Sequence, residues 1–168
     1  ASLNGQNRGG ADAVIAMYSS AGDAQWLRQF GTAADDFLSA IAVAADGAIY
    51  VSGTKMNDYL QQAVLTAFSP AGEPRWKRTL GGDYFDSAWG VAVNMAGDVV
   101  LAGEKFGQAF AASFTSGGTP RWTRTLPTYP TSPVYAAVDP TGDLLLAGTI
   151  YTSAARSHFD GYLAKFSD

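Results

Sequence analysis

Three pairs of tryptophan and arginine, with one residue between the two, have the chemistry best suited to binding a ligand. The pairs are Trp26 and Arg28, Trp76 and Arg78, and Trp122 and Arg124. An aromatic face beside a guanidinium group can hold a sugar or an anion. Repetition at equivalent positions favours a structural role instead, in which tryptophan packs between neighbouring sheets and arginine reaches a carboxylate. Asp36 and Asp86, which precede the following strands, are the expected carboxylate partners.

The remaining groups give little support for catalysis or for a cofactor. Two acidic loops, with Asp35 and Asp36 in one and Asp83 and Asp86 in the other, are candidate Ca²⁺ ligands. Two or three carboxylates on separate loops fit solvated or arginine-paired acids better, so no cofactor is expected. The single histidine, His158, has no G-x-S-x-G motif to accompany it, and we interpret it as a loop residue without a catalytic role.

The composition is typical of an acidic folded domain. The 168 residues are 47% hydrophobic and 15% charged, with a net charge of -4 and no cysteine. This chain is long enough for a sizeable core and too apolar for disorder. No basic run suggests a nucleic-acid partner, and no apolar run approaches the roughly 20 residues of a membrane span. No signal sequence stands at the start, so we expect a cleaved leader or an upstream segment.

A repeat of 45–50 residues organises the chain. Trp76 follows Trp26 by 50 residues, and Trp122 follows after another 46. Each period predicts four short strands joined by glycine turns: an Ala-rich strand, a strand ending in glycine, a strand apolar on both faces, and the tryptophan strand. Strands that are apolar on both sides must be covered on both sides. Small residues in the first strand suit the place where sheets converge most closely.

We therefore predict an all-β fold, a partial β-propeller of four-stranded antiparallel blades. The predicted segments are the outer half of one blade (1–30), two complete blades (37–80 and 87–126) and three strands of a fourth (134–167). An open arc would expose apolar flanks and unpaired strand edges at both ends. We expect the missing parts to come from a longer chain or from further copies that close the ring.

The repeats resemble the bacterial SBBP type of β-propeller repeat. The likeness rests on an Asp-Ala-x-x-Ala start at Asp12, on Gly22, Trp26 and Gly31, and on the strand that ends at Gly53. It covers nearly all of residues 10–168, with departures at Gln62 and Gln108 and in the third repeat, where 127–133 replace the glycine and the acids. The resemblance implies a secreted, periplasmic or cell-surface bacterial protein and no single activity. A second likeness is to repeats of quinone-dependent dehydrogenases and of an outer-membrane assembly lipoprotein.

Two functions fit this fold. The first is a non-enzymatic scaffold that binds a protein partner, further blades or copies, or a glycan. Its partner would contact loops that differ between repeats, through the candidates Asn4, Lys55, Tyr59, Tyr129, Tyr151 and His158. The second is a fragment of a propeller enzyme, such as a hydrolase, lyase or quinone-dependent dehydrogenase, with its site at the central channel. Only Asn94 and Asp139 are placed for that, so the sequence favours the scaffold.

Overall fold

A computed structural model describes residues 8–57, 60–81, 86–126, 134–139, 141–151 and 158–166. Every regular element in these ranges is a β-strand, which confirms the predicted all-β class. Among the described residues no helix is long and apolar enough to cross a membrane.

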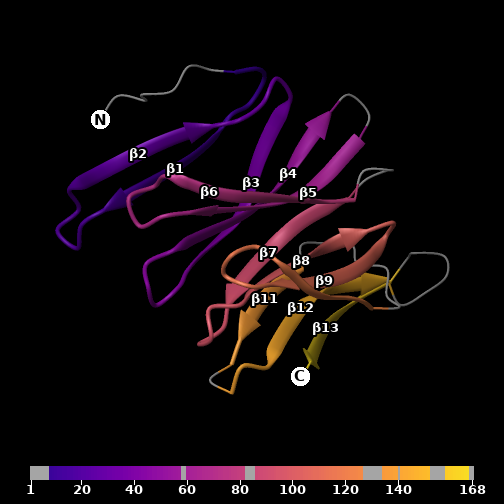
Figure 1. The fold of residues 1–168 in the computed structure, drawn as a ribbon. Helices are drawn as coiled ribbons and strands as arrows, with labels where there is room; N and C mark the ends of the chain where they lie inside the picture. Colours follow the sequence, from indigo (N-terminus) through magenta and orange to yellow (C-terminus); the bar gives the residue numbers. More distant parts are fainter. Residues whose placement is uncertain are drawn as a thin grey trace.

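The strands form four antiparallel sheets in chain order (Figure 1). The first sheet pairs β1 (Ala13–Tyr18) with β2 (Ala24–Phe30). The second holds β3 (Asp35–Val43), β4 (Ile49–Asn57), β5 (Leu60–Phe68) and β6 (Pro74–Leu80). The third holds β7 (Ser87–Val93), β8 (Val99–Lys105), β9 (Gln108–Phe114) and β10 (Pro120–Thr125), and the fourth β11 (Tyr135–Val138), β12 (Leu144–Tyr151) and β13 (Phe159–Phe166). Sequence neighbours pair in each sheet, so the predicted order of the four strand types is observed.

A glycine in the second strand of the unit makes room for a β-bulge in the first strand. The pairing of β3 with β4 shifts between Leu38 and Ala40, and the pairing of β7 with β8 shifts between Ala88 and Gly90. A side chain built on Gly103 would fall on the backbone carbonyl of Ser87. The recurrence of glycine at this position of successive repeats therefore has a steric cause, because any Cβ would push the bulged strand away.

Three apolar clusters lie between consecutive sheets. One joins Ile15 on β1 to Val51 and Phe68 of the second sheet. The largest joins Tyr50 and Leu65 of the second sheet to Leu101 and Phe110 of the third. The last joins the third sheet to the fourth and includes Val100, Val134 and Leu146. Each four-stranded sheet thus buries both faces, as the strands without polar alternation predict.

The first strands of successive units bring the sheets together. β7 contacts both β3 and β11, and all three are first strands. At Gly90, a Cβ would lie 2.8 Å from the carbonyl oxygen of Val134 and 2.9 Å from the amide nitrogen of Ala136. Such a close approach of two backbones requires a residue without a side chain. The small residues predicted for this strand accordingly lie where the sheets converge.

Two apolar surfaces are left uncovered by described residues, one on strands of the first and second sheets and one on the fourth sheet. Val14, Ile41 and Val43 are exposed on the side of β1 and β3, with exposed fractions of 43%, 57% and 63%. Tyr135 and Leu163 are exposed on the fourth sheet, at 63% and 72%. Large contiguous apolar surface is uncommon on a monomer and marks a contact face.

Candidate functional site

The tryptophans of β2 and β6 rest on a turn of the following sheet. A side chain on Gly72 would lie 3.0 Å from the ring of Trp26, and one on Gly118 would lie 2.7 Å from the ring of Trp76. Trp76 also donates its indole N–H to the carbonyl oxygen of Ser116 at 2.9 Å. Both turn glycines have positive φ, 76° and 81°. Each turn therefore requires glycine at this position for two reasons: the backbone has positive φ, and a tryptophan ring occupies the space where a side chain would lie.

The arginine of each pair lies over its own tryptophan, and Arg28 and Arg78 also reach the turn on which that tryptophan rests. The guanidinium carbons of Arg28, Arg78 and Arg124 are 5.6, 5.5 and 5.7 Å from the indole centroids of Trp26, Trp76 and Trp122, within cation–π range. Arg78 donates Nε–H to the carbonyl of Gly118 at 2.7 Å. Trp122 packs with the cluster between the third and fourth sheets. These pairs act across the sheet interfaces.

The predicted pairing of these arginines with Asp36 and Asp86 is wrong. Arg28 binds Glu73 at 3.0 Å, because its side chain points to the turn of the next sheet. Asp36 instead accepts hydrogen bonds from the backbone N–H and hydroxyl of Thr32, at 2.6 and 2.8 Å. Asp86 is 1% exposed and accepts the backbone N–H of Phe106 at 3.2 Å. Both acids therefore hold loop backbone at the start of a first strand.

Two predicted partner-contact residues lie in strands and not in loops. Lys55 belongs to β4 and pairs with Gln62, because the hairpin continues to Asn57 and Leu60. Tyr151 ends β12 and pairs with Phe159, whose ring lies 5.1 Å away. His158 is exposed beside that pair. The candidates Asn4, Tyr59 and Tyr129 lie outside the described residues.

A cleft lies between the first and second sheets. It has a volume of about 430 Å³, within the range of small-molecule sites. Val51, Val64 and Phe68 form a buried apolar wall, and Phe30 faces them from β2. We call this space the inter-sheet cleft.

Five of the eleven Lys and Arg residues of the chain line the inter-sheet cleft, against one acid, Asp36. The cations are Arg8, Arg28, Lys55, Arg75 and Lys77. Arg75 and Lys77 are exposed at the rim, and neither forms an ion pair with a described carboxylate. The sequence pattern did not predict this group, although side-chain alternation along a strand puts Lys77 on the face opposite Trp76. The available signal was the comparison of repeats, since Lys77 and Val64 stand where the next unit has Thr123 and Phe110.

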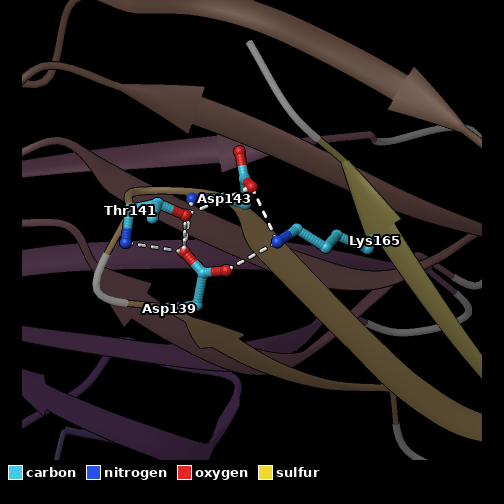
Figure 2. Close-up of polar contacts among 4 residues, drawn as sticks. All are labelled: Asp139, Thr141, Asp143 and Lys165. Atoms are coloured by element: carbon cyan, nitrogen blue, oxygen red, sulfur yellow. Dashed lines mark hydrogen bonds and ion pairs between the residues drawn. The ribbon is translucent and has the colours of Figure 1, made fainter.

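Asn94 and Asp139 are the two polar residues predicted at the mouth of a central channel. In the structure, the side chain of each binds the backbone of a hairpin turn. Asn94 accepts the backbone N–H of Asp98 at 2.8 Å. Asp139 accepts the backbone N–H groups of Thr141 and Asp143 and the hydroxyl of Thr141, at 2.9, 3.0 and 2.6 Å. Figure 2 shows Lys165 reaching both carboxylates of this turn, at 2.8 Å from Asp139 and 2.7 Å from Asp143. Each side chain is thereby occupied in holding a hairpin together.

These contacts shift the pKa of both partners. The hydrogen bond from Lys165, followed by that from Thr141, holds the pKa of Asp139 well below its ordinary 3.8. The hydrogen bonds to Asp139 and then Asp143 raise the pKa of Lys165 above 10.5. The carboxylate contribution to stability is present above the ordinary carboxyl pKa and is lost as pH falls through the folded value. The lysine contribution is present below its ordinary pKa and is lost as pH rises through the folded value.

Replacing Lys165 by methionine should raise the pKa of Asp139 toward its ordinary value, because the main stabiliser of the charged carboxylate is removed. A carbon-detected NMR titration of the side-chain carboxyl groups measures this shift. Lys105→Met is the control, since the Lys105 ammonium lies 5.6 Å from the Phe106 ring centroid and is not in this group. An Asp139 pKa equal to that of the wild type would contradict the pairing.

Within the described ranges, no three His, Asp or Glu side chains come together as a metal site. Of the Ca²⁺ candidates, Asp83 lies outside those ranges. Asp35 accepts the backbone N–H of Ala11 at 2.6 Å, so it too holds loop backbone.

Comparisons with known proteins bear on the fold. No protein-family model matches the sequence, and no curated protein matches it. The chain is similar to the 1.35 Å crystal structure of a protein of unknown function from Bacteroides caccae. The TM-score is 0.53 and the sequence identity 13%, and the match covers 79% of this chain and 45% of that chain. The chain thus spans less than half of that protein's length, and a likeness at this identity concerns the fold alone.

Proposed function

We propose that the chain is an arc of a β-propeller. Support comes from four consecutive antiparallel sheets that use their strands in the same order and meet through β3, β7 and β11. Radial blades converge at their inner strands, where side chains must be small. The contact of Gly90 with the backbone of β11 fits this arrangement. The tryptophan contacts with the next sheet's turn would then lie between the outer strands of neighbouring blades.

The function that this architecture supports best is a non-enzymatic scaffold that binds other protein surface. One observation carries the proposal: the apolar faces left uncovered at the two ends of the arc, marked by Ile41 and Val43 on one side and Tyr135 and Leu163 on the other. The repeat equivalents of Ile41 and Leu163 at the interface of the second and third sheets, Val91 and Leu65, are only 6% and 0% exposed. Further blades of the same protein or a second copy would cover them in the same way. The proposed location, secreted, periplasmic or at the bacterial cell surface, is only what the resemblance of the repeats to the SBBP type implies.

Sedimentation equilibrium of the chain tests the scaffold role. The wild type should self-associate through its open faces. Ile41→Lys or Leu163→Lys should weaken that association by about tenfold or more, since burial of one isoleucine or leucine side chain contributes about 1.5–3 kcal/mol. Met95→Lys is the matched control, because Met95 is 87% exposed in a hairpin turn. A wild type that stays monomeric at every concentration, or equal effects of the three variants, would contradict the proposal.

An enzymatic role has a separate test. Hydrolase or lyase turnover above background that disappears in Asp139→Asn would show that the scaffold assignment is wrong. Unchanged background in both proteins is the expected result, because Asp139 is engaged with a turn and with Lys165.

A further inference from the structure

We infer that the inter-sheet cleft binds an amphipathic organic anion, with an apolar body between the sheets and its acidic group at the cationic rim. The site is distinct from the apolar end faces and does not depend on ring closure. Three features carry the inference: the space between the sheets, the two rim cations Arg75 and Lys77 that form no ion pair with a described carboxylate, and the apolar wall.

The space is specific to the interface between the first and second sheets. The corresponding region between the third and fourth sheets, lined by Trp122, Arg124 and Phe166, holds about 20 Å³, against about 430 Å³ for the inter-sheet cleft. At the interface of the second and third sheets, Phe110 of β9 is 1% exposed and fills the position that Val64 occupies on β5. The smaller side chain of Val64 therefore helps to leave the first interface open.

In the third sheet an aspartate neutralises one arginine, and the second sheet has no acid at the equivalent position. In the third sheet Arg121 binds Asp98, with Nε 3.1 Å from the carboxylate. The equivalent arginine of the second sheet is Arg75. The residue equivalent to Asp98 is Ala48, which closes the corresponding hairpin turn, so the second sheet has no carboxylate at this position. Lys77, two residues along the same face of β6, adds a second exposed ammonium group. A cluster of cations in a chain of net charge -4 attracts an anion from solution.

The wall behind these cations is apolar and buried. Val51, Val64 and Phe68 have exposed fractions of 2%, 8% and 2% and face Phe30 across the cleft. The ring centroids of Phe30 and Phe68 are 5.0 Å apart at one end. A ligand with only charge would gain nothing from the apolar lining of the cleft, and a neutral one would leave the two rim cations without a partner. An alkyl or aryl carboxylate or sulfonate satisfies both.

Calorimetric titration with decanoate and with decyltrimethylammonium, which share a chain length and differ in charge, tests the inference. Decanoate should bind saturably and about tenfold or more tightly than the cation. Val64→Phe, which copies the residue of the next unit, should abolish decanoate binding because it fills the space. Arg75→Gln with Lys77→Gln, both at exposed positions, should weaken it by about tenfold.

Lys105→Gln removes a cation outside the cleft and should leave decanoate binding unchanged. Equal binding of the two ligands, or decanoate binding that Val64→Phe leaves unchanged, would assign it to the apolar end faces and overturn the inference. The Ile41→Lys and Leu163→Lys variants should bind decanoate as the wild type does, so failure of the scaffold proposal is recognised separately.

Discussion

Trp76→Ala should lower the free energy of unfolding by about 3 kcal/mol, the lower end of the range for removing a large aromatic from a packed site, because Trp76 is only half-buried. The substitution removes the packing on Gly118, the hydrogen bond to Ser116 and the ring contact with Tyr50 at 5.8 Å. For a domain of this size the melting temperature should fall by roughly 6–12 °C. Urea unfolding followed by tryptophan fluorescence and circular dichroism measures the change.

Trp76→Phe separates packing from hydrogen bonding at the same position. It keeps an aromatic ring on the turn of the third sheet and loses the indole N–H, so the loss should be about 1 kcal/mol. If alanine at position 76 destabilised the protein no more than phenylalanine does, the ring would not be packed between the second and third sheets.

Gly103→Ala should destabilise the fold by about 2–3 kcal/mol, although the change adds one methyl group. The new Cβ would fall on the carbonyl of Ser87 and lie 2.9 Å from the Cα of Ala88, both in the backbone of the bulged strand β7. Backbone in the middle of a sheet cannot move without breaking the pairing of β7 with β8. Denaturant unfolding measures this loss.

Gly161→Ala is the matched control, because Gly161 also lies in a strand, and the nearest atom to its added Cβ is 4.0 Å away. This substitution should be neutral or stabilise the protein by about 0.5 kcal/mol, since alanine restricts the unfolded chain more than glycine does. Similar losses for both variants would refute a steric origin for the glycine requirement at position 103.

The sheet architecture could be predicted because the repeat supplies each strand more than once. Trp26, Trp76 and Trp122 mark one strand type, and Gly53, Gly103 and Gly148 mark another, so errors at one copy are corrected by the others. Boundaries were less certain: β3 begins at Asp35, two residues before the predicted start at Phe37. The hairpin of β4 and β5 is also longer than predicted, since Lys55 and Gln62 have no apolar pattern to indicate that the pairing continues.

The polar partners could not be predicted, because they depend on which turn of the next sheet faces a side chain. Arg28 reaches Glu73, 45 residues ahead, and no local pattern connects the two. The inter-sheet cleft is also invisible within one repeat. It follows from differences between copies, such as Val64 against Phe110 and Ala48 against Asp98, once the sheets are known to face each other.

Nuclear Overhauser contacts between protons of consecutive sheets test most directly whether these sheets pack through their inner strands and tryptophans. We expect cross-peaks from the Trp26 ring to the α-protons of Gly72, from the Trp76 ring to those of Gly118, and from Gly90 to the methyl group of Ala136. A folded sample that shows the contacts within each sheet and lacks these three would contradict this packing.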